Sequence, residues 1–272
     1  MSLSIVTITY NDPAGLLKTI ESLKDLPQTG LDWEHIIIDA SPGANAEVFA
    51  KLPSHWPLVH ITEEPRGIYS AQNSGLNNSR KSVVWFLNGG DRLKSPGTLK
   101  HLSTRFEKET KLDLLCAGAD LYRGDAFLYP RNPTAPLIKN ILGSNRICHQ
   151  ALLYRRSSLL SIGPFREGYR LAADYEHLFR CYVANLEVAF TAETLVEYQM
   201  DGQSGNYRDV FQEFRKVHRT MRTALPLWAV ILNEVAREVE GSRLSLLKAL
   251  ARSPAAGLLR PLWLAWNRRG AR

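Results

Sequence analysis

Short apolar runs rich in β-branched residues alternate with longer helical patterns throughout the first 120 residues. This alternation is typical of βαβ units, in which a helix joins two parallel strands and covers one face of their sheet. It predicts a doubly wound α/β domain with a mostly parallel sheet flanked by helices. The expected strands span 3–9, 33–39, 58–62, 83–87 and 112–119, and the expected helices span 13–25, 44–51, 68–80 and 96–107.

Polar loops follow the first four expected strands, at the edge where ligands bind in sheets of this kind. Each loop also has a local explanation: Asp12 before Pro13 is a good helix N-cap, and paired glycines suit a tight turn. An acid that ends a buried strand, such as Asp39 or Asp91, nevertheless needs a partner. The loops are Thr9-Tyr10-Asn11-Asp12, Asp39-Ala40-Ser41, Glu63-Glu64-Pro65-Arg66-Gly67 and Asn88-Gly89-Gly90-Asp91.

Two of these loops carry candidate binding groups. Asp91 offers a carboxylate that suits Mg²⁺ or Mn²⁺ shared with substrate phosphates, or it only caps its turn. Arg66 and Gly67 open a helix, which suits an anionic ligand at the helix N-terminus, although a strand-to-helix turn also explains the glycine. The sequence has no G-x-x-x-x-G-K-[ST] loop and no G-x-G-x-x-G after the first strand, which disfavours a P-loop NTPase or a Rossmann dehydrogenase.

The second half of the sequence is less regular. Asp174 is expected in the first turn of a helix, where it is either a general base or an acid that stabilises the helix dipole. His149 is likewise either a catalyst or an ordinary polar residue with its bonds satisfied. We expect a hairpin with a long loop over 121–146, two apolar runs over 151–154 and 195–200, and a turn over 202–206. Helices are expected over 171–183 and 207–223.

The positive charge is concentrated at the C-terminal end. The chain has 34 Lys+Arg and 27 Asp+Glu, and residues 241–272 hold seven of the cations and no acid, so the remainder has 27 of each. A neutral body argues against a nucleic-acid partner. Apolar residues mixed with these cations suit a helical tail over 224–272 that lies on an anionic membrane surface, or one that packs on the domain with a solvated basic face.

Cysteine usage and hydropathy indicate a reducing compartment. Cys116, Cys148 and Cys181 are widely separated and show no C-x-x-C spacing, so neither a disulfide framework nor a zinc ribbon is expected. The sequence shows neither a signal-peptide pattern at its start nor an apolar stretch of the roughly 18–20 residues that span a bilayer. We therefore expect a cytoplasmic location.

Together these segments resemble family 2 of the inverting nucleotide-sugar glycosyltransferases, and especially its bacterial members in exopolysaccharide, colanic-acid and lipopolysaccharide biosynthesis. The resemblance covers about residues 3–215 and implies the Rossmann-like GT-A fold over 1–223, with a nucleotide-binding half over about 1–120 and an acceptor half over about 121–223. It rests on SIVTITYND, HIIIDASPG, EPRGIYSAQNSGLNNSR, VVWFLNGGDRL, HQALLYRRSSLLSIGPF, LAADYEHLFR and MDGQSG in this order.

The resemblance implies a donor site at the polar loops. Asp39 would accept a hydrogen bond from the nucleotide base, and Asp91 would bind a divalent cation on the diphosphate. Many relatives carry further acids where this chain has Asn88 and Gly90, so the cation would be held mainly by substrate phosphates. The residues implied to contact the nucleotide are Thr9, Tyr10, Asn11, Asp39, Arg66, Gly67, Asn73, Asn88 and Gly90.

The resemblance also implies a catalytic and acceptor site. Asp174 would be the general base, His149 and Gln150 would lie near the sugar or the acceptor, and Ser204 would lie in a loop that closes over the diphosphate.

The implied reaction is a single displacement with inversion, from a UDP-sugar or secondarily a GDP-sugar to a lipid-linked saccharide. Mn²⁺ or Mg²⁺ would assist it. It would take place at the inner face of the cytoplasmic membrane, in the synthesis of a cell-surface polysaccharide. Asn88 and Gly90 motivate one alternative, which is a noncatalytic membrane-associated scaffold that binds sugar nucleotides.

Overall fold

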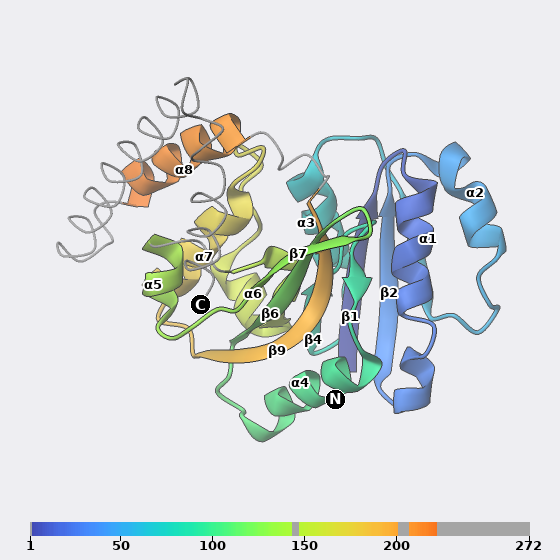
Figure 1. Cartoon of the computed structure of the whole chain (residues 1–272), viewed down its shortest axis with the longest axis horizontal. Helices are drawn as coiled ribbons and strands as arrows, with labels where there is room; N and C mark the ends of the chain where they lie inside the picture. Colours follow the sequence, from blue (N-terminus) through green and yellow to red (C-terminus); the bar gives the residue numbers. More distant parts are fainter. Residues whose placement is uncertain (1, 143–146, 201–206, 222–272) are drawn as a thin grey trace, which may run out of the picture. The chain divides into compact units, whose positions relative to one another are not determined.

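The computed structural model describes residues 2–142, 147–200 and 207–221, and its first half builds four parallel strands on one side of a mixed sheet (Figure 1). Helices connect these strands, as the alternating pattern predicts. The strands are β1 Ser2–Thr9, β2 Asp32–Asp39, β3 Leu58–Thr62 and β4 Val83–Phe86, and the helices between them are α1 Pro13–Ser22, the 3-10 turn η1 Leu26–Thr29, α2 Pro42–Ala50 and α3 Ile68–Asn78.

The second half of the chain extends the same sheet and adds helices around it (Figure 1). The long segment over 121–146 that we expected to be a hairpin and a loop contains the hairpin and also a short helix, α5. The elements are β5 Arg92–Leu93, α4 Pro96–Lys108, β6 Leu114–Arg123, β7 Ala126–Arg131, α5 Leu137–Leu142, the 3-10 turn η2 His149–Ala151, β8 Leu152–Arg155, α6 Arg156–Ile162, α7 Ala173–Val183, β9 Val188–Gln199 and α8 Tyr207–Met221.

The strand order is β3-β2-β1-β4-β8-β6-β9-β5, with β7 paired to β6. Strand β8 is antiparallel to both β4 and β6, so β6 runs in the same direction as β4 but does not contact it. The sequence pattern identified β6 as a strand and could not indicate that a later segment would be inserted beside it. The mostly parallel α/β architecture is confirmed.

Local sequence explains how the first strand and its helix are held in place. The Asp12 carboxylate accepts a hydrogen bond of 2.8 Å from the Gly15 N–H and caps α1, whose first helical residue is Pro13. On α3, Gly75 allows a close approach to β1, because a Cβ at that position would lie 2.2 Å from Cγ1 of Val6. The core strands β1 and β4 are buried on both faces, which is typical of parallel sheets covered by helices.

A buried histidine links β2 to β1 and makes folding sensitive to acid. His35 is 0% exposed; its Nδ1 accepts from Trp56 Nε1 at 3.1 Å and its Nε2 lies 2.9 Å from Thr7 Oγ1, which donates to the Leu87 carbonyl. This chain of bonds fits the neutral ring with its proton on Nε2. Burial lowers the pKa of His35 from 6.5 to about 3.

We therefore expect the contribution of His35 to the stability of the domain to fall in mild acid. Below pH 6.5 His35 binds a proton in the unfolded chain, whereas in the folded chain it stays neutral down to about pH 3. The contribution of His35 to stability is therefore fully present above pH 6.5 and is lost as the pH falls below that value. The free energy of unfolding should drop by about 2 kcal/mol between pH 8 and pH 5 from this group. Urea unfolding of the wild type and of His35→Gln isolates this contribution: the difference between their free energies of unfolding should fall by about 2 kcal/mol from pH 8 to pH 5. The difference between the wild type and His55→Gln, at an exposed position, should stay constant.

Among the described residues, no helix combines the length and the apolar character needed to cross a membrane. The basic tail expected over 224–272 and the expected turn with Ser204 lie outside the described residues.

Candidate functional site

The loops after the four parallel strands meet at one edge of the sheet and bond to one another. The Ala40 N–H donates to the Thr9 carbonyl at 3.1 Å, and the Glu63 N–H donates to the Asp39 carbonyl at 3.1 Å. On the other side of β1, the Gly89 N–H donates to the Ile8 carbonyl at 3.0 Å. The polar residues singled out by sequence position therefore share one edge.

The first loop exposes an aromatic ring. Tyr10 is 55% exposed, and Asn11 adopts a left-handed conformation with φ of 49°, which asparagine tolerates better than most residues. The Asn11 N–H donates to Ser41 Oγ at 2.7 Å and so joins the loops after β1 and β2. An exposed ring on a fixed turn can stack on a planar ligand such as a nucleotide base.

Asp39 is fully buried at the end of β2 and is bonded within the protein. Its Oδ1 accepts from the Ser41 N–H at 2.9 Å and from Asn45 Nδ2 at 2.8 Å, and its Oδ2 lies 3.3 Å from His60 Nε2. Asn45 and His60 are partners that sequence reasoning missed, because neither follows a strand. A nucleotide base would have to replace His60 at Oδ2, since the Asp39 side chain is 0% exposed and that of His60 is 31% exposed.

Of the residues expected at the third loop, Asn73 has a different environment from Arg66 and Gly67. Arg66 is exposed, and Gly67 takes a φ of 111° that favours glycine directly before α3. The Asn73 amide accepts from the Phe165 N–H at 2.8 Å and donates to the Phe165 carbonyl at 2.9 Å, besides Glu167 Oε1 at 3.2 Å. These bonds fix the segment after α6, which is a structural role.

Hydrogen bonds from α1 hold the loop that carries Asp91. Thr19 Oγ1 accepts from the Gly90 N–H at 3.0 Å and donates to the Asp91 carbonyl at 2.7 Å, while the Asp91 N–H donates to the Asn88 carbonyl at 3.1 Å. The Asn88 side-chain oxygen accepts from Gln72 Nε2 at 3.3 Å. Thr19 and Gln72 lie inside helices, so position after a strand did not identify them.

Asp91 itself is a buried carboxylate with a raised affinity for a proton. It is 4% exposed, and its Oδ1 accepts from the Gln199 N–H at 2.9 Å. Burial raises the pKa of Asp91 to about 8, although the bond from Gln199 opposes this shift. Because a nearby cation favours the ionised form, the site is suited to a positively charged ligand.

The residues around Asp91 fit a cation that is held in part by its substrate. Among the described residues, no cluster of three or more His, Cys, Asp or Glu side chains is placed to bind a metal ion. A single carboxylate suits Mg²⁺ or Mn²⁺ whose remaining ligands are phosphate oxygens and water. Asp12 lies near this loop as well, because a Cβ on Gly90 would be 3.9 Å from its Oδ2.

We expect Thr19→Val to loosen this loop. The substitution keeps the shape of the side chain and leaves the Gly90 N–H without its acceptor, which should cost about 1–3 kcal/mol of unfolding free energy. Thermal unfolding should show the loss, and Mn²⁺-dependent binding of UDP or GDP should weaken in calorimetry. Thr19→Ser should restore both, and Thr110→Val, at an exposed position, should change neither; wild-type metal-dependent binding in Thr19→Val would contradict the role of this hydroxyl.

A second group of polar residues gathers around the start of α7. Asp174 is the second residue of this helix, and its Oδ1 accepts from the Tyr69 hydroxyl at 2.9 Å and from the Tyr175 N–H at 2.8 Å. His149 is 8% exposed, and the Asp174 charge acts on it against the burial that lowers the pKa of His149. The structure thus brings Asp174 and His149 together with Tyr69, a residue that sequence reasoning left unassigned.

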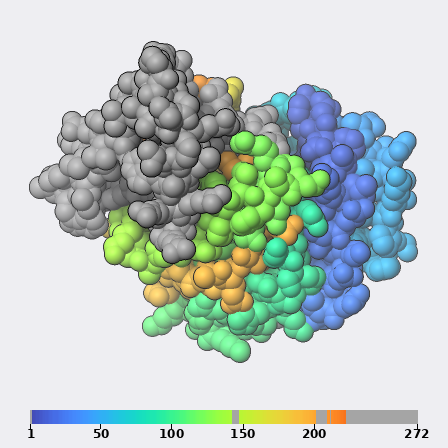
Figure 2. Space-filling model, viewed as in Figure 1, coloured from blue at the N-terminus to red at the C-terminus, as the bar shows by residue number. Residues whose placement is uncertain are grey.

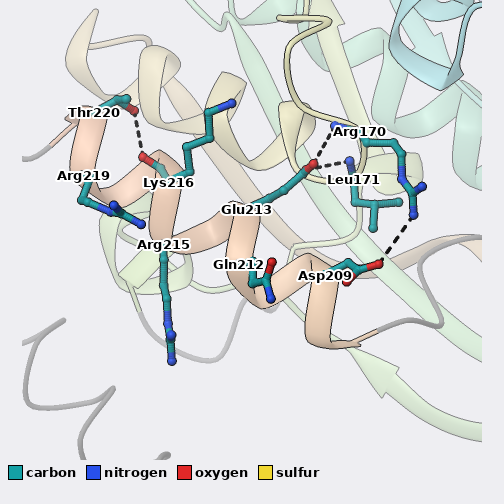
Figure 3. A pocket seen from close by; sticks show the side chains of 9 residues that line it. All are labelled: Arg170, Leu171, Asp209, Gln212, Glu213, Arg215, Lys216, Arg219 and Thr220. Atoms are coloured by element: carbon teal, nitrogen blue, oxygen red, sulfur yellow. Dashed lines mark hydrogen bonds and ion pairs between the residues drawn. The ribbon is translucent and has the colours of Figure 1, made fainter.

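The segment before α7 is fixed by α8. Glu213 accepts from the N–H groups of Arg170 and Leu171 at 2.8 and 2.7 Å, and Arg170 pairs with Asp209 at 3.7 Å (Figure 3). An open groove of about 910 Å³ lies at these residues, and none of the predicted site residues lines it. The contacts of α8 therefore help to hold the segment that leads to Asp174.

The β6–β7 hairpin adjoins the Asp91 loop and reaches the surface. The Gln199 N–H donates to Asp91, and the Gln199 side chain donates to the Gly124 carbonyl at 3.1 Å. Figure 2 shows the hairpin, in light green, on the face in view, and its β7 residues Phe127 and Tyr129 are 53% and 39% exposed. This surface is suited to apolar or sugar-ring contacts next to the site.

Several buried polar atoms in the described part of the chain have no hydrogen-bond partner, and most belong to residues of the two groups. Thr9 Oγ1 and Gln72 Oε1 lie by the strand edge, and both ring nitrogens of His149 lie by Asp174. Buried polar groups are nearly always bonded, so such exceptions point to water or to a ligand. Gln150, by contrast, has hydrogen-bond partners. Its backbone carbonyl accepts from Trp85 Nε1 at 2.6 Å, and its side-chain oxygen accepts from Cys148 Sγ at 3.3 Å.

Comparison with known proteins identifies related sequences. The family model described as "Glycosyl transferase family 2" matches residues 4–165. An uncharacterized glycosyltransferase of Mycobacterium tuberculosis is 27% identical over 228 residues, which cover 79% of this chain and 82% of that protein. A PGL/p-HBAD biosynthesis glycosyltransferase of Mycobacterium bovis is 27% identical over 186 residues, which cover 66% of this chain and 69% of that one.

Solved structures share the fold. The crystal structure of S. aureus TarS 1–349 in complex with UDP has a TM-score of 0.65 at 17% identity and covers 97% of this chain and 78% of that one. The mannosyltransferase PcManGT from Pyrobaculum calidifontis in complex with GDP-Man and Mn²⁺ has a TM-score of 0.59 at 14% identity, covering 97% and 79%. The chain spans 64% of another TarS 1–349 structure and 40% of a longer TarS chain. This likeness establishes the GT-A fold.

Proposed function

The chain belongs to glycosyltransferase family 2, and on that basis we propose that it transfers a sugar from a nucleoside-diphosphate sugar to an acceptor hydroxyl with inversion. The observation that carries the proposal is the presence of two acids in different environments, one in each group of polar residues. Asp91 is buried in the loop that follows β4, and Asp174 starts a helix with one oxygen bonded and His149 beside it. One acid suits a cation on the donor, and the other suits proton transfer.

In the proposed reaction, Asp174 accepts the proton of the acceptor hydroxyl as that oxygen attacks the anomeric carbon. The carbon–oxygen bond to the diphosphate breaks in the same step, so a single displacement inverts the configuration. When bound, Mn²⁺ or Mg²⁺ supplies charge neutralisation on the departing diphosphate. Asp91 would bind that cation, and the turn fixed by Thr19 holds Asp91 in place.

For the donor we propose a UDP-sugar first and a GDP-sugar second. The support is the ring of Tyr10 and the polar residues Asn11 and Asp39 at the strand edge, where a base and a ribose would lie. Neighbours of the same fold contain UDP-GlcNAc in one case and GDP-Man with Mn²⁺ in another.

For the acceptor we propose a lipid-linked saccharide at the inner face of the cytoplasmic membrane, in the synthesis of a bacterial cell-surface polysaccharide. The exposed aromatic residues of β7 beside the Asp91 loop suit contacts with sugar rings. The basic, apolar tail over 224–272 has a composition that suits an anionic membrane surface.

A noncatalytic scaffold that binds sugar nucleotides is the second candidate. The observation that favours it is that Asn88 and Gly90 leave Asp91 as the single acid of the segment Asn88-Gly89-Gly90-Asp91. It predicts nucleotide binding without turnover, whereas the enzyme consumes its donor.

A thermal-shift screen tests the donor site. The full chain is heated with UDP-GlcNAc, GDP-mannose or dTDP-glucose, each with Mn²⁺, Mg²⁺ or EDTA, and ATP with Mn²⁺ serves as the control nucleotide. A ligand at 100 times its Kd adds about 2.7 kcal/mol, so one donor should raise Tm visibly and its effect should shrink in EDTA. If none of the three sugar nucleotides stabilises the protein more than ATP does, the proposed donor site is wrong.

A further inference from the structure

We propose that Tyr69 is a positioning residue that orients the carboxylate of Asp174 for catalysis; this inference rests on the proposed function of Asp174 as general base. Tyr69 lies 105 residues before Asp174 in the chain, and its hydroxyl donates to Asp174 Oδ1 at 2.9 Å. It acts through Asp174 and is not itself assigned a contact with substrate.

The geometry divides the two oxygens of Asp174 between two tasks. Oδ1 accepts from both the Tyr69 hydroxyl and the Tyr175 N–H, at 2.9 and 2.8 Å. Two donors on one oxygen fix the rotation of the carboxylate group and leave Oδ2 to take the acceptor proton. Such bonds to an ionised carboxylate are among the stronger ones, so this orientation is well defined.

The surroundings of Tyr69 fix its ring in turn. The side chain is 7% exposed, and its ring lies 5.9 Å from that of Phe165, whose backbone is bonded on both sides to Asn73 of the same helix α3. Helix α3 begins one residue before Tyr69, directly after Arg66 and Gly67. Tyr69 therefore ties the turn expected at the donor to the helix that carries the base, so that donor and base keep a constant spacing.

Tyr69 keeps its proton over the whole range in which such an enzyme works. Burial, and then the charge of Asp174, raise the pKa of Tyr69 well above its ordinary value, so the hydroxyl always donates. Asp174 also acts electrostatically on His149 and Tyr154, both deeply buried. His149 prefers its neutral form there, since burial lowers its pKa.

The test uses Tyr69→Phe, which removes the hydroxyl and keeps the ring. Because water can serve as the acceptor, the release of UDP or GDP from UDP-GlcNAc and GDP-mannose is followed as a function of pH. We expect kcat to fall about tenfold, the KM for the donor to stay within about twofold, and the acidic limb of the kcat profile to move to higher pH, because the ionised base has lost a donor. Tyr182→Phe removes the hydroxyl of a half-buried side chain about two turns after Asp174 on the same helix α7 and should leave kcat and the profile unchanged.

A double-mutant cycle separates this inference from the proposal on which it rests. If Tyr69 acts through Asp174, Tyr69→Phe should have no effect on the residual rate of Asp174→Asn. A wild-type kcat and pH profile in Tyr69→Phe, with Asp174→Asn inactive, would overturn the positioning role and leave the base in place. Wild-type activity in Asp174→Asn would instead overturn the base itself. Equal losses from Tyr69→Phe and Tyr182→Phe, with matched falls in Tm, would show a merely structural effect and overturn the inference.

Discussion

Asp174→Asn should lower the rate of sugar transfer by about 10²–10⁴-fold, the range of a lost general base, while the affinity for the donor stays near that of the wild type. The amide keeps the shape of the carboxylate and can still accept from Tyr69, so the site should remain folded. It cannot take the acceptor proton. Single-turnover release of UDP or GDP measures the step, and calorimetry with the same donor measures binding.

Asp25→Asn is the matched control for this variant. Asp25 is an exposed acid directly before η1, and its side chain accepts from Gln28 Nε2 at 3.2 Å. It should leave the rate unchanged. A rate in Asp174→Asn within a factor of two of the wild type would contradict the assignment of the base.

Asp91→Asn should abolish the Mn²⁺-dependent part of donor binding. Asp91 is the one acid of its loop, and the amide lacks the charge that holds the cation. We expect the affinity for UDP or GDP in Mn²⁺ to fall by about tenfold or more, equivalent to about 1.4 kcal/mol, and to match the wild type in EDTA. Isothermal titration of both proteins with and without EDTA measures the difference.

The same substitution should not lower the stability of the metal-free protein. The pKa of Asp91 in the fold, about 8, lies above its ordinary value of 3.8, so the contribution of Asp91 to stability is lost as pH rises from 4 to 8. Asp91→Asn lacks this loss and should be no less stable than the wild type at pH 8 in EDTA. Equal Mn²⁺-dependent affinity in both proteins would contradict the role of Asp91 at the donor site.

The sheet edge was predictable because it depends on local patterns. Buried parallel strands are continuous apolar runs, and the residue after each run lies at the carboxyl edge, so the positions of Asp39 and Asp91 followed from the sequence alone. The order of the second half was not predictable in this way. Strand β8 is inserted between β4 and β6 through pairing of distant segments, and hydrophobic periodicity carries no signal for such pairing.

The partners of the site residues were the least predictable part. Tyr69 and Thr19 lie inside helices and read as ordinary helical residues, yet they bond to Asp174 and to the Asp91 loop across 105 and 72 positions. The bonds between Asn73 and the backbone of Phe165 were likewise not indicated by the sequence. Such roles depend on which helix faces which loop, which becomes apparent once the tertiary structure is known.

The most direct test of the account is the configuration of the sugar when it is first released. UDP-GlcNAc and GDP-mannose both carry the sugar in the α configuration, and time-resolved proton NMR of the protein with either donor and Mn²⁺ observes the anomer formed before mutarotation. We expect the β anomer from the wild type and its release to be at least about 10²-fold slower from Asp174→Asn. Initial release of the α anomer, or no consumption of a donor that binds, would contradict a single displacement assisted by Asp174.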